Sequence, residues 1–221
     1  MTLSGRGLSY RVGDRTVIDQ VDVDAHSGEM LAVCGPSGAG KSTLLTMLGG
    51  LIAPDSGTVS LDDAPVRVGD LALRRRIAVV LQGYGLVTAL TGRENIGIAL
   101  QARGATRAQV RLRTAEVLEK VGLSEVADHL IEDMSGGQQQ RVAVARALVG
   151  APEVLLADEP TAELDAENRE RIVTLLSDHA HSGAIVLIAS HDPDVVASCD
   201  DMVELDAGRV VAGRPARHRR R

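Results

Sequence analysis

The segment Gly35–Ser42 constrains the fold of this chain more than any other feature. It reads G-P-S-G-A-G-K-S and matches the phosphate-loop pattern G-x-x-x-x-G-K-[ST]. The apolar run Met30–Cys34 precedes it and the helical stretch Lys41–Gly50 follows, which is the strand–loop–helix setting that the pattern needs. Such a loop points several backbone N–H groups at one anion, at the start of a helix. A glycine-rich turn without a ligand is the alternative, but it would leave the lysine and the serine without a purpose.

The loop predicts binding of a nucleotide phosphate, without choosing among kinases, GTPases and motors. Lys41 supplies a mobile positive charge for the outer phosphates, and the hydroxyl of Ser42 can ligate Mg²⁺. The predicted phosphate-binding residues are Gly35, Pro36, Ser37, Gly38, Ala39, Gly40, Lys41, Ser42 and Thr43.

Two acidic residues follow the apolar run Val154–Ala157. Asp158 and Glu159 should stand at the carboxyl end of a buried strand, which is the edge where open parallel sheets bind ligands. Asp158 suits a hold on Mg²⁺, and Glu159 can orient and deprotonate a water molecule. The alternative is that both acids only cap the next helix. An acid that can activate water favours hydrolysis over transfer to another substrate.

The pattern of apolar runs indicates an α/β fold. Ile77–Leu81, Val154–Ala157 and Ile185–Ala189 have the length and composition of strands buried on both faces of a parallel sheet. Val17–Val23 alternates between apolar and polar residues as a half-exposed strand does, and Glu167–His179 has a helical pattern.

A helical region interrupts this pattern between about residues 83 and 150. It contains no convincing strand and three predicted helices, Arg93–Ala102, Arg107–Val121 and Gln138–Val149. We therefore predict one domain over residues 1–213, with a sheet core at about 1–82 and 151–213 and a helical subdomain inserted at about 83–150. The tail 214–221 holds five Arg and one His and is predicted to be disordered.

Composition excludes several classes of protein. The net charge of −6 argues against a nucleic-acid-coating protein, whose surface is normally basic. No apolar run approaches the roughly 20 residues of a membrane span, and the segment Met1–Ser4 does not resemble the start of a signal peptide. Cys34 and Cys199 are far apart and indicate no disulfide framework or metal cluster, so a reduced, cytosolic setting is expected. For a function at a membrane, another chain would have to do the spanning.

The stretch Met134–Arg141, which reads M-S-G-G-Q-Q-Q-R, is the most informative of all. Ser135 is a good helix N-cap, and the two glycines after it leave the helix start sterically open. The stretch resembles the signature of the ABC ATPases, usually Leu-Ser-Gly-Gly-Gln, with Met134 as a volume-conserving change. The resemblance extends over about residues 3–212. It implies a P-loop NTPase of ABC type, with a RecA-like, mostly parallel sheet core, an antiparallel β edge and an inserted helical subdomain.

The other marks of this family occur in the family's order. The resemblance implies that Gln82 touches the metal or the attacking water, that Asp165 belongs to the D-loop, and that His191 contacts the γ-phosphate. Tyr10 matches the aromatic residue that stacks on adenine, and the alternative is a strand-end tyrosine that packs on the sheet edge. The predicted catalytic residues are thus Lys41, Gln82, Glu159 and His191, the predicted metal ligands Ser42, Gln82 and Asp158, and the further predicted ATP contacts Tyr10, Ser135, Gly136, Gly137, Gln138 and Asp165.

The mechanism implied by the resemblance is a nucleotide-gated clamp. Two subunits, identical or related, hold two ATP molecules between the Lys41 loop of one and the Ser135 loop of the other, and hydrolysis releases them. A separate integral-membrane permease recognises the substrate, so that the subunit would be cytoplasmic and peripheral on the membrane. Leu48–Leu51 and Leu155–Thr161 resemble the branch that serves exporters, such as the lipoprotein-release, macrolide-efflux and FtsE-like systems.

Two other function classes stay open beside an exporter ATPase. One is an FtsE-like regulator, in which ATP cycling moves a permease-like partner without transport. The other is a DNA-repair or chromosome-organising ABC ATPase, which normally carries coiled-coil or zinc insertions that this compact chain lacks.

Two loops depart from the family pattern. Tyr84 lies in Gly83–Leu86, where the family often has Phe and Leu-Pro, and Ala162-Glu163 replaces the Gly-Asn usual in this branch. The expected permease-facing groove consists of Gln82, Tyr84, Leu86, Val87 and Leu90, because an apolar cluster in a loop is typical of a contact surface. The alternative is that Leu86 and Leu90 tuck into the core of the helical subdomain.

Overall fold

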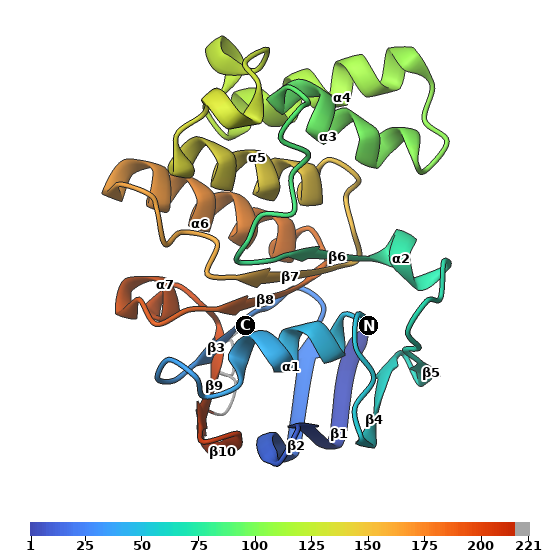
Figure 1. Cartoon of the computed structure of the whole chain (residues 1–221), viewed down its shortest axis with the longest axis vertical. Coiled ribbons are helices and arrows are strands. Elements are labelled where there is room, and N and C mark those ends of the chain that lie inside the picture. Colours follow the sequence, from blue (N-terminus) through green and yellow to red (C-terminus); the bar gives the residue numbers. More distant parts are fainter. Residues whose placement is uncertain (215–221) are drawn as a thin grey trace, which may run out of the picture.

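A six-stranded sheet forms the centre of the fold in the computed structural model, which describes residues 1–214 (Figure 1). In spatial order its strands are β10 (Arg209–Arg214), β9 (Asp201–Asp206), β3 (Met30–Cys34), β8 (Ile185–Ala189), β7 (Val154–Asp158) and β6 (Ile77–Val80). All neighbours pair in parallel except β10, which is an antiparallel edge strand. Every residue of β7 and β8 is buried, as expected for strands covered on both faces.

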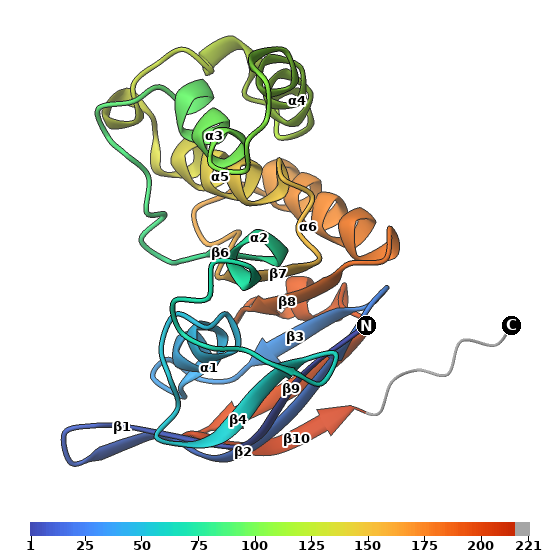
Figure 2. The same ribbon diagram turned by 90° about the vertical axis from the view of Figure 1, so that its right-hand side faces the viewer.

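A separate antiparallel sheet lies beside the end of the central sheet that β9 and β10 form (Figure 2). Its strands, in spatial order, are β2 (Arg15–His26), β1 (Thr2–Val12), β4 (Ser56–Leu61) and β5 (Ala64–Pro65). The predicted antiparallel β edge is therefore confirmed, but most of it is a sheet of its own. Only the middle of β2 was predicted as a strand, because β1 contains glycines and lacks a strict alternation.

Helices cover both faces of the central sheet. The helix α1 (Lys41–Leu48) packs on one face, and α6 (Ala166–His181) and α5 (Gly136–Leu148) lie over the other (Figure 1). Two further helices, α3 (Gly92–Gln101) and α4 (Arg107–Lys120), lie beyond α5. The remaining helical turns are α2 (Leu73–Arg76), α7 (Pro193–Ala197) and the 3₁₀ turns Ser124–Val126 and Ile131–Asp133.

The predicted positions of the five long helices, α1, α3, α4, α5 and α6, are confirmed to within two residues at each end. Their boundaries have local causes: α3, α4 and α5 each begin at a capping box, with Thr91, Thr106 and Ser135 as N-caps. The residues between β6 and β7 form no strand longer than a single bridge, between Thr91 and Leu130.

Two hydrophobic clusters make up the core, one on each face of the central sheet. One joins α1 and the antiparallel sheet to the lower face, with Leu44, Val59 and Leu187 among its members. The other joins α3, α4 and α5 to α6 and the upper face, through residues such as Ile96 and Val186. The helical region thus shares a core with the sheet, and the division at residues 82 and 150 stays a prediction. Of the predicted tail, Arg214 ends β10, and residues 215–221 lie outside the described part.

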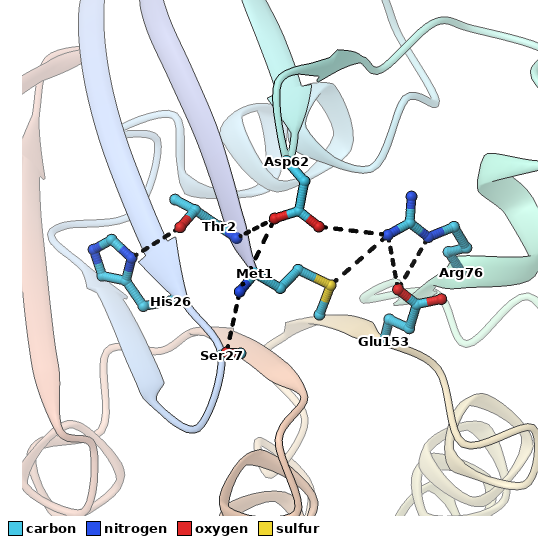
Figure 3. A network of polar contacts seen from close by, with 7 residues as sticks. All are labelled: Met1, Thr2, His26, Ser27, Asp62, Arg76 and Glu153. Atoms are coloured by element: carbon cyan, nitrogen blue, oxygen red, sulfur yellow. Dashed lines mark hydrogen bonds and ion pairs between the residues drawn. The ribbon is translucent and has the colours of Figure 1, made fainter.

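Polar contacts tie the two sheets together near the start of the chain (Figure 3). Asp62, after β4, accepts a hydrogen bond of 2.8 Å from the backbone of Thr2 and lies 3.7 Å from the guanidinium of Arg76. Arg76, at the end of α2, also contacts Glu153 at 2.8 Å, next to the start of β7. Exposed ion pairs of this kind contribute about 0–1 kcal/mol each. Their role is to fix α2 and β7 against β1 and β4.

Among residues 1–214, no helix combines the length and apolarity that crossing a membrane requires.

Candidate active site

The predicted catalytic residues and metal ligands gather at the carboxyl ends of neighbouring strands of the central sheet. The phosphate loop follows β3, Gln82 follows β6, Asp158 ends β7, and His191 follows β8. They surround a cavity of about 520 Å³, which is lined by Arg15, Val17, Ser37, Gly38, Gly40, Lys41, Ser42, Thr43, Gln82, Asp158, Glu159, Ala162 and His191. This is the edge at which an open parallel sheet binds its ligands.

Glycines shape the phosphate loop because neighbouring backbone passes close to it. Gly35 has a φ of 135°, and a β-carbon there would overlap the carbonyl oxygen of Leu205. Gly40, the N-cap of α1, has a φ of 105°, and a β-carbon there would lie 2.7 Å from Cδ1 of Ile18. Side chains other than hydrogen are thus excluded at both positions.

Lys41 lies inside this loop. Its Nζ donates to the carbonyl oxygens of Gly35 at 2.8 Å and Pro36 at 3.1 Å, and the residue is only 8% exposed. The ammonium is thus held in the loop by backbone carbonyls, and it can turn from them toward an anion that enters the loop.

Asp158 faces the same loop across the cavity. The pKa of the Asp158 carboxyl is raised, chiefly by burial and also by the nearby charge of Glu159. A hydrogen bond with the Ser42 hydroxyl and the charge of Lys41 oppose this rise in the pKa. Ser42, Asp158 and Gln82 all carry oxygen atoms toward one cavity, and oxygen is the donor that Mg²⁺ prefers. Residues 1–214 contain no group of three or more His, Cys, Asp or Glu side chains placed to hold a metal. The donor set fits Mg²⁺ shared with phosphates, for which one or two protein ligands suffice.

Glu159 is held by the residues that follow β8. Its Oε1 lies 2.7 Å from Nδ1 of His191, and its Oε2 accepts from the Ser190 hydroxyl at 3.4 Å. The carboxylate can only accept when ionised, so Nδ1 of His191 donates and leaves Nε2 free for the cavity. Glu159 has a φ of 48°, a left-handed conformation that is uncommon for a residue with a side chain. Its carboxylate is therefore fixed in direction, as a base that orients water must be.

The glycines at the start of α5 lie apart from this cavity. Ser135 caps the helix by accepting from the backbone of Gln138 at 3.3 Å, and the Gln138 side chain accepts from the backbone of Ser135 at 2.9 Å. None of the residues Ser135–Gln138 lines the cavity around Lys41. Asp165 is also outside it and caps α6 by accepting from Asn168 at 2.8 Å, a contact that lowers the pKa of Asp165. The start of α1 thus lines the cavity and the start of α5 does not, and the binding of phosphate by Ser135, Gly136 and Gly137 stays a prediction.

A sequence profile of the family described as ABC transporter matches residues 18–162, which include the phosphate loop, Asp158 and the start of α5. The chain belongs to the ABC transporter family of ATP-binding proteins. Within it, the chain is 38% identical to an uncharacterized ABC transporter ATP-binding protein of Mycobacterium tuberculosis, over 97% of this chain and 67% of that protein. It is 41% identical to the methionine import ATP-binding protein MetN of Caulobacter vibrioides, over 96% of this chain and 65% of MetN.

The chain spans only about two thirds of these two relatives, but it covers 95% of YvrO of Bacillus subtilis, an uncharacterized ABC transporter ATP-binding protein that is 38% identical. The dimeric structure of the cassette MJ0796 superposes with a TM-score of 0.90 at 32% identity, over 97% of this chain and 99% of that one. A second MJ0796 structure, described as a dimeric post-hydrolysis state bound to ADP and Pi, has a TM-score of 0.89. The fold predicted for the ABC ATPases is confirmed.

Tyr10, predicted to stack on adenine, lies in β1 opposite Ile18 of β2. Its side chain packs partly against the lower core, and it does not line the cavity, whereas its neighbours Arg15 and Val17 do. Ile18 in turn approaches Gly40 of the phosphate loop, so Tyr10 lies one strand away from that loop. Its role toward adenine stays a prediction.

The apolar residues of the loop between β6 and α3 were predicted to face a permease or, alternatively, to pack into the core, and the structure divides them between an exposed and a packed group. Tyr84 and Leu86 pack against the upper core, as the alternative held for Leu86. The side chain of Val87 is 46% exposed, although its backbone is fixed by two hydrogen bonds with buried Asn95, of 2.8 and 3.0 Å. The exposed part of the predicted permease-facing groove is therefore centred on Gln82 and Val87.

Two residues that lie near the site, Arg15 and Gln140, were not predicted from the sequence. Arg15, at the start of β2, adds a positive charge to the cavity, and nothing in its sequence context indicates this. Gln140 in α5 is buried, donates to the carbonyl of Glu159 at 2.5 Å and accepts from the backbone of Glu163 at 3.0 Å. Here a signal was available, because Gln140 shares a helix face with apolar residues three and four positions later.

Proposed function

We propose that this protein hydrolyses ATP as a dimer and drives a separate membrane permease, as the motor subunit of an exporter. The observation that carries the proposal is the separation of the two anion-binding helix starts. The Lys41 cavity contains a base, a metal-binding oxygen set and one phosphate cradle, whereas the start of α5 belongs to no cavity with them. One triphosphate needs only one cradle, so the second cradle serves an ATP molecule held by another copy. The MJ0796 cassette, dimeric with ADP and Pi, supports this arrangement.

In this mechanism the residues of the chain divide the work. Lys41 and the loop amides bind the outer phosphates, and Ser42, Asp158 and Gln82 would hold Mg²⁺, which when bound neutralises charge on the phosphates. Glu159, aligned by His191, would accept the proton of the attacking water. The decisive measurement is ATP-dependent dimerisation of the Glu159→Gln variant, which should bind ATP without hydrolysing it, with and without the added substitution Ser135→Arg.

The adenine contact gives a prediction of its own. Tyr10→Ala should weaken ATP binding by about 1–3 kcal/mol, the value of one stacked base. Tyr10→Phe keeps the ring and should bind like the parent. Equilibrium titration with a fluorescent ATP analogue measures both, and thermal unfolding checks that the alanine variant is folded. Equal losses in the two variants would point to the hydroxyl instead of the ring.

The permease contact gives a second prediction. Val87→Asp should prevent recovery of an integral-membrane partner, because it places a charge on an exposed apolar side chain whose backbone is rigidly held. The assay is capture of the tagged full chain from detergent-solubilised membranes. Leu112→Asp on α4, exposed to 61%, is the matched control and should retain the partner. If both variants capture the same membrane protein as the parent, Val87 does not face the permease.

The direction of transport needs a separate test, because MetN, named for methionine import, is as similar to this chain as the other relatives are. Once the permease is known, vesicles that contain both proteins, with ATP and substrate outside, should accumulate the substrate in the ATP-free lumen if the system is an exporter.

A further inference from the structure

Arg15 reaches the Lys41 cavity from a different sheet than the predicted catalytic residues do. It is the first residue of β2 in the antiparallel sheet, and it pairs with Val12 next to the tight turn that joins β1 to β2. Its side chain is exposed, and within residues 1–214 its guanidinium has neither a hydrogen bond nor an ion pair. A solvated surface arginine has the same features, so the position of the guanidinium relative to the phosphate loop decides the interpretation.

The backbone of β2 is fixed against the phosphate loop a few residues after Arg15. Gly208, in the turn between β9 and β10, donates its N–H to the carbonyl oxygen of Ala39 at 3.1 Å and accepts from the backbone of Asp19 at 2.9 Å. Ile18 is fully buried and contacts the loop at Gly40. The strand that carries Arg15 is thus held beside the loop, so that only the arginine side chain has to move to meet a ligand there.

The guanidinium of Arg15 lies over Gly38 of the phosphate loop. A β-carbon built on Gly38 would be 3.8 Å from a terminal nitrogen of Arg15, and no other side chain comes within 4 Å of that position. Gly38 has a φ of 80° and belongs to the curl that points backbone N–H groups at one anion. Two positive charges therefore stand at the loop, with Lys41 inside it and Arg15 over Gly38.

We propose that Arg15 is a second phosphate-binding residue, which contacts the phosphate chain of ATP from β2 while the loop holds it from the central sheet. A guanidinium is planar and always charged, and it donates two parallel hydrogen bonds to phosphate oxygens. Because the Arg15 guanidinium has no partner in the described part of the chain, it gives up no protein contact when it turns to a phosphate. The inference rests on the proposed function, because it takes ATP as the ligand of the Lys41 cavity.

The expected role of Arg15 is to hold ATP and not to assist the chemical step. Glu159 and His191, which handle the attacking water in the proposed function, lie at the edge of the central sheet, whereas Arg15 is an exposed residue of the other sheet. A contact of this kind is made equally in the bound substrate and in the transition state, so its loss changes affinity and leaves kcat as it was.

Arg15→Ala should weaken binding of the non-hydrolysable ATP analogue AMP-PNP about five- to twentyfold, the effect of losing charged hydrogen bonds at an exposed site. It should raise the KM for ATP by a similar factor, with kcat at saturating ATP within about twofold of the parent. Inorganic tripolyphosphate has the phosphate chain without the base or the sugar, and its binding should weaken by the same factor. Arg15→Lys keeps the charge but loses the paired hydrogen bonds, and should have an intermediate affinity.

The test is isothermal titration calorimetry of the full chain with AMP-PNP and with tripolyphosphate, beside steady-state ATP hydrolysis and thermal unfolding of each variant. Arg11→Ala is the matched control, because Arg11 is exposed on β1 at the same turn and lies outside the cavity. It removes the same charge and should bind AMP-PNP within about twofold of the parent.

An Arg15→Ala affinity within about threefold of the parent, or an equal loss in Arg11→Ala, would overturn the contact with phosphate. A loss for AMP-PNP without one for tripolyphosphate would place Arg15 on the base or sugar, and a fall in kcat with unchanged binding would place it in the chemical step; either result also overturns the proposal. Hydrolysis by Lys41→Ala separates the two levels of the argument. A parent no more active than Lys41→Ala overturns the proposed function, whereas an active parent with unchanged binding by Arg15→Ala overturns only the role of Arg15.

Discussion

Replacing Lys41 by alanine should reduce ATP hydrolysis at least about a hundredfold, the usual scale for removing a charge-stabilising group from a preorganised site. The ammonium is already inside the phosphate loop, held by the carbonyl oxygens of Gly35 and Pro36, so ATP needs only a small displacement to replace them. Without it the loop retains its backbone N–H groups, which can bind phosphates but cannot follow the charge that develops in the transition state.

The chain offers a matched control, because it contains only two lysines. Lys120 is exposed at the end of α4 and distant from the cavity, so Lys120→Ala should hydrolyse ATP at the parent's rate. Release of phosphate by purified parent and variants, with their unfolding temperatures, is the measurement. If Lys41→Ala retains activity within twofold of the parent, the Gly35–Ser42 loop is not the site of hydrolysis.

The parts of the fold that sequence could predict are those with a local cause. Continuous apolar runs such as Ile185–Ala189 became the buried strands, and capping residues such as Thr106 mark the helix starts. The strands β1, β4 and β9 were missed, because they carry charged or glycine residues on a partly exposed face and are specified by partners far along the chain. The pairing of Leu3 with Leu61 and Ala25 has no signal within either segment.

The candidate site shows the same division. The phosphate loop and the two acids at the end of β7 lie at the edge of the sheet where the sequence placed them, because a motif and a strand end determine their positions. The contacts of Gln140 with the backbone of Glu159 and Glu163 arise only when α5 packs against the loop after β7, so they are a property of the tertiary structure.

Replacing Glu159 by glutamine should separate ATP binding from turnover. The amide keeps the size of the carboxylate and can still accept from Nδ1 of His191, which lies 2.7 Å away in the parent, but it cannot take a proton from water. ATP should therefore bind and persist. Because the γ-phosphate is proposed to join the Lys41 loop of one copy to the start of α5 of the other, the variant should stay dimeric in Mg-ATP and revert in Mg-ADP.

Size-exclusion chromatography with light scattering measures this directly, and a second substitution tests the trans arrangement. Adding Ser135→Arg to Glu159→Gln should restore the monomer, because a bulky cation at the N-cap blocks the start of α5 without touching the Lys41 cavity. Its loss of the cap should cost only about 1 kcal/mol of folding free energy, so the double variant should remain folded and still bind ATP. A Glu159→Gln variant that is monomeric at every ATP concentration would contradict the shared site. A dimer that survives Ser135→Arg would place the joining contact away from α5.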